Sequence, residues 1–393
     1  MKRLYLVIPF LLILFLIPLI SASAAGESGM LADAGVLCLP GIYMSNPGNC
    51  ASAGPSTYLT SMAENGFTFP AAPLPVSKPD RALTQINTGY GMVNKRNAPV
   101  YGSLEAAVKN KKGEAIRTID ASFSYISYID EQYVDGKRFY QVEYGEWMTA
   151  NDIIRLGSVP LFQGVQLSRT PKNAFGWVLS YLSPGPVETK RTPGYQNQDY
   201  TGHILNNQDL VQVYGVEKVG EDEWYMVGPD EWLPDRVVAR VIPNSTPPQG
   251  VPGERWIEVN LYEQTLAVYD QGELVFATLI ASGLEPFWTR PGLFQIYRKL
   301  DSGPMSGSFE ADRSDAYYLE DVPWTMYYDE ARALHGAYWR ANLGFPQSHG
   351  CVNLTVGDSR WIFDWAQEGD WVYVWDPSGK TPVDPSAYTQ GGA

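Results

Sequence analysis

Short runs that alternate between hydrophobic and polar positions dominate the last third of the chain. W-I-E-V-N-L, Q-T-L-A-V-Y and L-V-F-A-T-L-I occupy 256–261, 264–269 and 274–280, and D-Q-G-E forms a turn before the third run. A period of two is typical of half-buried strands, and short turns between them favour antiparallel pairing. We expect this meander to continue through 293–297 and to close with W-V-Y-V-W at 371–375. The pattern predicts a mainly β domain, built as a sandwich or barrel.

One segment before the last strand has the period of a helix instead. Ile362, Phe363 and Ala366 lie along one face of it, and Gly369 follows as a terminator. Residues 357–359, with the sequence G-D-S, supply a candidate capping residue. These signals predict one short helix between residue 357 and residue 369.

The middle of the chain, from about 88 to 242, consists of short aromatic and β-branched runs broken by turns such as D-G at 135–136. It contains an internal repeat: F-Y-Q-V-E-Y-G-E-W-M at 139–148 aligns without gaps onto W-Y-M-V-G-P-D-E-W-L at 224–233, and the same offset pairs Ile126 with Val211. Two copies of a small β unit are therefore predicted within 89–242. Trp147 and Trp232 are either core residues of these units or exposed ligand contacts.

The remaining segments lack such patterns. Residues 1–24 combine Lys2 and Arg3, an apolar run and a final A-S-A, which predicts a cleaved signal peptide, with a retained anchor as the alternative. Residues 25–88 are rich in Pro, Ala, Ser and Gly, which predicts an irregular segment. The same kind of composition predicts a linker at 243–254 and a loose tail at 377–393. The expected domains are thus 89–242 and 255–376.

Charge and cysteine content limit the classes of partner and of site that the chain can have. The net charge of −14 argues against nucleic acid as a partner and against a polybasic attachment to anionic lipid, because both need clustered Lys and Arg. An exported chain folds in an oxidising compartment, so we expect Cys38 to pair with Cys50 and Cys351 to remain a free thiol. The spacing of the three cysteines and three histidines does not fit a zinc site, and we expect neither a metal nor a cofactor.

The chemistry of the chain concentrates at 335–353, H-G-A-Y-W-R-A-N-L-G-F-P-Q-S-H-G-C-V-N. This stretch holds His335, His349 and Cys351, and a thiol needs a base within hydrogen-bond reach before it can attack a carbonyl. Gly350, next to the thiol, lets backbone N–H groups approach a substrate closely. We expect Cys351 to be a catalytic nucleophile; the alternative is a small buried hydrophobic residue.

The motifs W-I-E-V-N-L, T-R-P-G-L-F-Q-I and L-G-F-P-Q-S-H-G-C-V-N-L, with the upstream His-Gly, resemble the L,D-transpeptidase (YkuD) catalytic domain over about 255–375. The repeats resemble the SH3-like modules that accompany cell-wall enzymes. The resemblance implies an enzyme of the cell envelope that acts on peptidoglycan stem peptides and has carbapenems as covalent inhibitors. The thiol would form a thioester with a tetrapeptide stem, release D-Ala, and pass the acyl group to another stem as a 3→3 cross-link. The alternatives are an L,D-carboxypeptidase on the same stems and a non-catalytic wall-binding protein.

The resemblance also implies roles for single residues. Cys351 matches the nucleophile and His335 the general base, whose ring would be oriented by the backbone carbonyl of Gly336. The N–H groups of Gly350 and Cys351 would stabilise the oxyanion. Three further residues would shape the site, with His349 either a structural residue or a substrate contact and Asn353 holding the cysteine loop: Ser348, His349 and Asn353.

Overall fold

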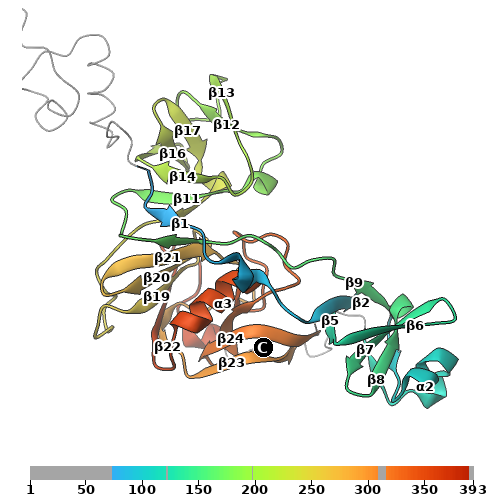
Figure 1. Cartoon of the computed structure of the whole chain (residues 1–393). Coiled ribbons are helices and arrows are strands. Elements are labelled where there is room, and N and C mark those ends of the chain that lie inside the picture. Colours follow the sequence, from blue (N-terminus) through green and yellow to red (C-terminus); the bar gives the residue numbers. More distant parts are fainter. Residues whose placement is uncertain (1–72, 121–122, 197, 309–315, 389–393) are drawn as a thin grey trace, which may run out of the picture. The chain divides into compact units, whose positions relative to one another are not determined.

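The computed structural model describes residues 73–120, 123–196, 198–308 and 316–388 (Figure 1). All of them belong to one compact unit, Asn65–Ala393. The predicted signal peptide and the predicted Cys38–Cys50 bond lie outside the described residues. In the described part of the chain, no helix has the length and apolar character needed to cross a membrane.

The predicted meander forms the centre of the first sheet of the C-terminal domain. Strands β19 (Trp256–Asn260), β20 (Thr265–Asp270) and β21 (Glu273–Leu279) are antiparallel neighbours. The last strand, β27 (Trp371–Trp375), pairs with β19 in parallel rather than antiparallel, and β22 (Gly292–Gln295) follows it. A parallel partner needs a long connection instead of a hairpin, and the chain between β19 and β27 provides it.

Two short upstream strands extend this sheet beyond β21. They are β10 (Val165–Leu167), which pairs with β21, and β1 (Val76–Ser77), which pairs with β10. The sequence assigned these residues to the β repeats and to the irregular segment, so the structure differs from the expected boundaries at both places. Runs of two or three residues are too short to show a hydrophobic period, which is why the pattern missed them.

The second sheet combines strands from both ends of the described chain. Its long central strand β24 (Tyr317–Asp329) pairs with β23 (Arg298–Gly307) on one side. On the other side it pairs with β25 (Arg332–Gly336) and, in parallel, with the upstream strand β5 (Phe123–Tyr128). The sheet then continues through three more strands: β26 (Val352–Leu354) beside β25, and β2 (Gly89–Val93) and β9 (Ile153–Arg155) beyond β5.

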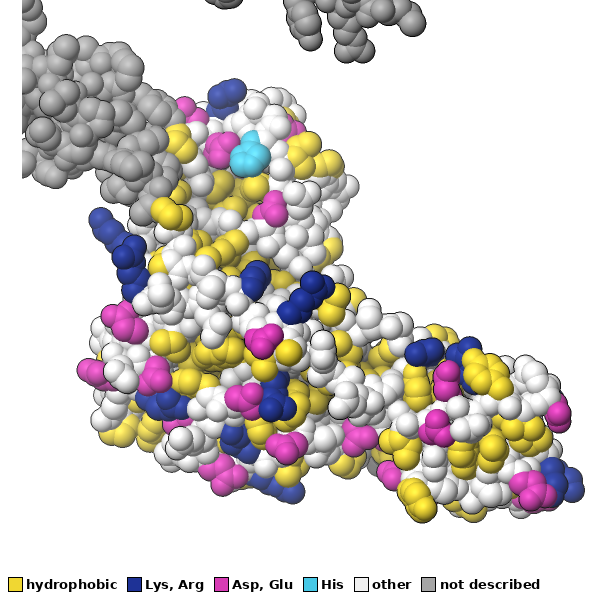
Figure 2. All heavy atoms as spheres, in the orientation of Figure 1, with side chains coloured by type: hydrophobic (Ala, Val, Ile, Leu, Met, Phe, Trp, Pro, Cys, Tyr) yellow, Lys and Arg dark blue, Asp and Glu magenta, His cyan; other side chains and the backbone are white. Residues whose placement is uncertain are grey.

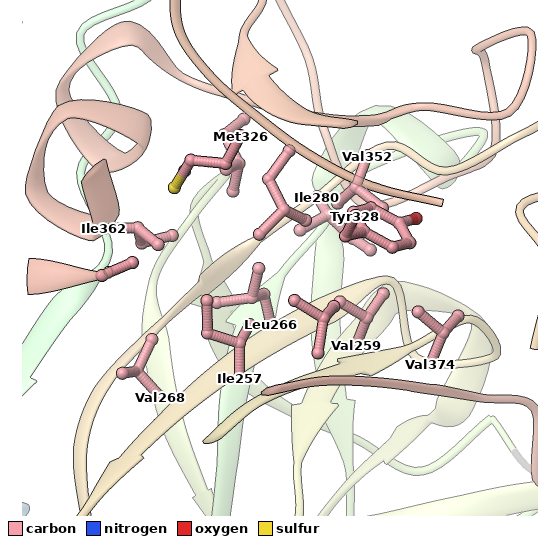
Figure 3. Packing of buried hydrophobic residues seen from close by; sticks show 14 of the residues in the cluster. Ile257, Val259, Leu266, Val268, Ile280, Met326, Tyr328, Val352, Ile362 and Val374 are labelled. Atoms are coloured by element: carbon pink, nitrogen blue, oxygen red, sulfur yellow. The ribbon is translucent and has the colours of Figure 1, made fainter. Parts of the chain in front are cut away.

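The domain core lies between these two sheets. Figure 3 shows Ile257, Val259 and Leu266 of the first sheet pointing toward Met326 and Val352 of the second. These side chains are fully buried, and each such burial stabilises the fold by about 1.5–3 kcal/mol. The sandwich predicted from the alternating pattern is therefore present, with both of its inner faces apolar.

The predicted helix is α3 (Val356–Trp365), but its cap differs from the expected one. Thr355 is the capping residue, and its hydroxyl accepts a hydrogen bond of 3.2 Å from Asp358 N–H. Asp358 cannot cap because its carboxylate is buried and accepts from Thr278 Oγ1 at 2.6 Å and from Gly164 N–H at 2.9 Å. The carboxylate thus joins α3 to β21 and to the segment before β10, and burial raises its pKa to about 6.

The internal repeat extends to the strand registers of both units. In the first unit, β7 (Lys137–Glu143) pairs Gln141 with Trp147 of β8 (Glu146–Thr149). In the second unit, β16 (Asp222–Gly228) pairs Met226 with Trp232 of β17 (Glu231–Pro234), which is the same pairing displaced by 85 residues. The offset also relates β2, β5, β6 (Asp130–Val134) and β9 to four strands of the second unit: β11 (Ala174–Val178), β14 (Leu210–Val213), β15 (Gly215–Val219) and β18 (Val238–Val241).

The other elements of the two units are short. They are β3 (Ala98–Val100), β4 (Arg117–Ile119), α2 (Leu104–Lys109), β12 (Val187–Lys190), β13 (Tyr200–Leu205) and single-turn 3₁₀ segments such as η4 (Ala150–Asp152) and η6 (Asp235–Val237). Trp147 is buried in the first unit, as the core alternative predicts, whereas Trp232 is half-buried. The SH3-like resemblance of the units stays a prediction.

Charged side chains of both signs are interspersed on the face in Figure 2. The basic side chains on that face do not form a continuous stripe.

Candidate active site

Cys351 lies at the start of β26, at the end of the loop that leads from β25. Its side chain is 6% exposed, and Sγ is 3.8 Å from the carbonyl oxygen of Ala331. Gly350 has φ +116°, a region that other residues rarely adopt, and a Cβ there would lie 3.2 Å from Nε of Arg332. The shape of the turn therefore requires a glycine before the thiol.

The pairing of β25 with β26 brings His335 to the same side of the sheet as Cys351. The two strands are parallel, with His335 opposite Asn353. Side chains alternate along a strand, so Cys351 and Asn353 share a face, and His335 lies on that face too. Both candidate catalytic residues line one pocket, together with Phe123, Met305, Tyr317, Leu319, Trp339, Arg340, Ser348, His349 and Asn353.

The His335 ring is held by its surroundings as the sequence predicted. Nδ1 is 3.4 Å from the carbonyl oxygen of Gly336, a long contact that favours the Nδ1–H form and leaves Nε2 as the proton acceptor. The ring of Trp339 lies 5.7 Å away, centroid to centroid, and limits the rotation of the imidazole.

Burial sets the charge of both groups at rest. It lowers the pKa of His335 to about 4, an effect that Arg340 increases and the Gly336 carbonyl opposes. It raises the pKa of Cys351 to about 11, against the Ala333 N–H and Arg332, which favour the thiolate. At neutral pH Cys351 is thus a thiol and His335 a neutral imidazole. A thiol attacks a carbonyl only as its proton leaves, so a nucleophilic Cys351 would need a base.

The buried imidazole predicts a specific pH dependence of stability. Between pH 6.5 and 4 the unfolded chain binds a proton on His335 that the folded protein does not, so stability falls as pH falls through this range. The full effect is about 3 kcal/mol. We expect the difference in unfolding free energy between wild type and His335→Asn, from urea titrations, to change by about this amount from pH 7 to pH 4. A difference that stays constant with pH would contradict a buried, neutral His335.

Ser348 and Gly350 brace the loop around the thiol. Ser348 Oγ donates to the carbonyl of Cys351 at 2.5 Å and accepts from Gly350 N–H at 3.1 Å. Because the Gly350 N–H is directed at this hydroxyl, it is a poor oxyanion donor in this conformation. The Cys351 N–H remains as the other donor of the predicted pair.

His349 and Asn353 both line the pocket. The His349 ring lies between two aromatic rings, 4.8 Å from Phe287 and 5.2 Å from Tyr317. Asn353 exchanges backbone hydrogen bonds of 3.0 Å with Ala281, which anchors the cysteine loop to the first sheet. Its side chain is buried, and Oδ1 has no hydrogen-bond partner among the described residues.

Comparison with known proteins relates this part of the chain to one family. Residues 254–374 match the family model for the L,D-transpeptidase catalytic domain, YkuD. Residues 254–374 belong to that family. The matched segment contains β19 to β27 and all of the predicted site residues of the catalytic domain.

Individual relatives match only part of the chain. YciB of Bacillus subtilis (strain 168), a candidate L,D-transpeptidase, is 23% identical over 127 residues, which cover 28% of this chain and 59% of that protein. This chain therefore spans less than two thirds of the length of that curated relative. Among solved structures, an L,D-transpeptidase from Stackebrandtia nassauensis is 24% identical with a TM-score of 0.26, covering 35% of this chain and 60% of that one. The catalytic domain of the E. faecium L,D-transpeptidase is 26% identical with a TM-score of 0.29, covering 32% of this chain and 100% of that one.

The sequence missed a buried ion cluster beneath the cysteine loop of the L,D-transpeptidase domain. Asp329 accepts from Nε of Arg290 at 2.9 Å and from Nη1 of Arg332 at 3.2 Å. Arg332 lies directly under Gly350, and Thr289, next to Arg290, donates to the Gly350 carbonyl at 2.9 Å. Asp329 and Arg332 are three residues apart at the turn between β24 and β25, whereas Arg290 comes from a distant loop, so the sequence pattern did not show that the three charges meet.

Other pocket residues were also missed, among them Phe123 and Arg340. Phe123 reaches the pocket from the first repeat, and Arg340 lies in the loop between β25 and β26. Arg340 is inside the quoted motif, but its spacing from Cys351 alone does not indicate that its side chain turns into the pocket.

Proposed function

We propose that this protein is an L,D-transpeptidase that forms 3→3 cross-links between peptidoglycan stems at the cell envelope. The observation that carries the proposal is the placement of Cys351 and His335 on one face of two paired strands, in one pocket of a domain of this family. The family match alone does not fix the reaction, and the thiol and imidazole supply the groups that acyl transfer needs.

The proposed reaction has two steps. His335 Nε2 takes the proton of Cys351 as Sγ attacks the carbonyl of the third residue of a tetrapeptide stem. The tetrahedral intermediate collapses to a thioester, the bond to D-Ala breaks, and the imidazolium returns its proton to the leaving amine. The amine of a second stem then attacks the thioester, and His335 takes a proton from this amine. The bond to Sγ breaks, and the imidazolium returns the proton to the sulfur, which restores the Cys351 thiol. Two stems are joined and one D-Ala is released.

Burial of the pocket favours the amine over water as the acceptor. Cys351 and His335 are 6% and 2% exposed, so little water reaches the thioester in the absence of a bound stem. A site open to water would favour the L,D-carboxypeptidase reaction instead.

Incubation with a defined disaccharide tetrapeptide tests the proposal. We expect mass spectrometry to show cross-linked dimers with loss of one D-Ala, and little tripeptide monomer. Tripeptide alone would indicate the carboxypeptidase, and no product at all would overturn the proposed enzyme.

Reaction with a carbapenem tests the reactivity of Cys351 independently of the stem substrate. We expect one covalent adduct, mapped to Cys351 by peptide mass, because a strained acyl donor can react without the correct stem. An adduct on another residue would place the nucleophile elsewhere.

A further inference from the structure

The first β repeat contributes directly to the active-site pocket. Strand β5 pairs in parallel with the start of β24, with Phe123 beside Tyr317 and Tyr125 beside Leu319. Residues paired in this way direct their side chains to the same side of a sheet, and Tyr317 and Leu319 line the pocket. Phe123 therefore forms a wall of the pocket that holds Cys351, although more than 200 residues separate the two in the chain.

Other contacts fix the first repeat in this position. The Tyr90 ring stacks on Tyr338 at 3.6 Å, and its hydroxyl donates to the carbonyl of Asp321 at 2.8 Å. Ser127 Oγ donates to Asp321 Oδ2 at 2.6 Å. Aromatic stacking and partly buried hydrogen bonds make this a fixed junction rather than a flexible tether.

The second repeat shows that these contacts are not a general property of the unit. The offset of 85 residues places Gln208 at the position of Phe123 and Leu210 at that of Tyr125. The equivalent strand β14 pairs with β11, and its sheet is separate from those of the catalytic domain. The second repeat also packs on the catalytic domain, through a shared core and the Arg240–Glu263 ion pair, but it has no aromatic residue at these two positions.

Arg340 lies beside Phe123, and its positive charge has no acidic partner among the described residues. The Arg340 guanidinium is 5.4 Å from the centroid of the Phe123 ring, and it donates to the carbonyl oxygen of Gln347 at 2.6 Å. No carboxylate pairs with Arg340 among the described residues, and its buried Nε lacks a hydrogen-bond partner there. A half-buried guanidinium with no counter-charge is costly, so this arrangement suits a ligand that brings the missing charge.

We propose that Arg340 binds a carboxylate of the substrate, in a subsite that Phe123 of the first repeat walls. This inference rests on the proposed function and deepens it. The guanidinium fork can pair with a carboxylate through two hydrogen bonds, and Gln347 holds the fork in place. A tetrapeptide stem offers two sources of this group near the scissile bond: the terminal carboxylate, and a side-chain carboxylate where the third residue is a diamino acid that carries one.

The two sources are separated by comparing three stems with wild type and Arg340→Gln. One stem carries both carboxylates, one is amidated at the side chain of the third residue, and one is amidated at the C-terminus. We expect wild type to lose about thirtyfold or more in kcat/KM on the stem that lacks the recognised carboxylate. Arg340→Gln should show the same low kcat/KM on that stem and on the complete one. Arg96→Gln, which removes an exposed arginine of the first repeat, should behave as wild type.

The wall is tested with Phe123→Gln, which places in the first repeat the residue that the second repeat already has at this position. We expect kcat/KM for the complete stem to fall about two- to fivefold, because the ring contact to the guanidinium is lost. The response to amidation should persist, because Arg340 is still present.

The outcomes separate this inference from the proposed function. Wild type that is inactive on every stem, with no carbapenem adduct at Cys351, defeats the proposed function. Active wild type with an unchanged amidation response in Arg340→Gln defeats the carboxylate subsite. Arg340→Gln that loses activity equally on all stems and also melts at a lower temperature shows a purely structural arginine, and this too overturns the inference. We expect its melting temperature to be unchanged or higher, because an uncompensated cation is removed.

Discussion

Replacing Cys351 by alanine is expected to remove cross-linking activity by a factor of at least about 10³, because no thioester can form without the sulfur. The loss should appear in the rate of dimer formation from a tetrapeptide stem, measured by mass spectrometry. Thermal unfolding should change little, since the substitution removes one small buried atom from a loop that Ser348 and Asn353 hold through backbone groups.

His203→Ala is the matched control for this experiment. His203 is an exposed imidazole of the second repeat, 2.9 Å from Glu231, and it lies outside the pocket. Its replacement should leave the rate unchanged. Full cross-linking by Cys351→Ala would show that the reaction takes place elsewhere in the protein.

The second large effect concerns Asp329, the carboxylate shared by Arg290 and Arg332 beneath the cysteine loop. Its side chain is 2% exposed, and Arg332 is 4% exposed. Asp329→Ala leaves a buried guanidinium without its anion, which destabilises the fold by about 3–5 kcal/mol. Chemical denaturation of the variant should show this loss, and residual activity at low temperature should fall as well, because Arg332 supports Gly350.

Asp364→Ala tests whether burial of the ion pair is the cause of the stability loss in Asp329→Ala. Asp364 pairs with Arg360 at 2.7 Å on the exposed side of α3, and a surface pair of this kind contributes at most about 0.5 kcal/mol. If both alanine variants lost the same stability, the ion cluster under the loop would have no special role.

The local parts of the site were predictable from sequence, and the distant parts were not. Cys351 and His335 were recognisable because a thiol and two imidazoles within 335–353 form one continuous motif. The Gly336 carbonyl was also placed correctly, because it is adjacent to the histidine that it orients. Phe123 reaches the site through a long-range strand pairing, and Arg290 reaches Asp329 from a distant loop, and no short-range pattern encodes either contact.

The fold shows the same difference between local features, which the sequence predicted, and distant ones, which it did not. Alternation over five or more residues predicted β19, β20 and β27, and the gapless repeat anticipated the hairpins of both units. The direction of β27 was missed, because a period of two describes a strand without saying which neighbour it has. The helix cap was missed for a different reason: Asp358 has a typical capping side chain, but tertiary hydrogen bonds to Thr278 and Gly164 use its carboxylate.

The pairings of β10 with β21 and of β5 with β24 affect how this protein can be truncated and how it folds during synthesis. A truncated protein limited to 254–374 would lack both partners and would expose open backbone donors and acceptors along two flanks. Open flanks of that kind recruit other strands and lead to self-association. During synthesis, the first repeat is made long before β24. Its strand β5 can therefore pair with β24 only after the C-terminal part of the chain has been made.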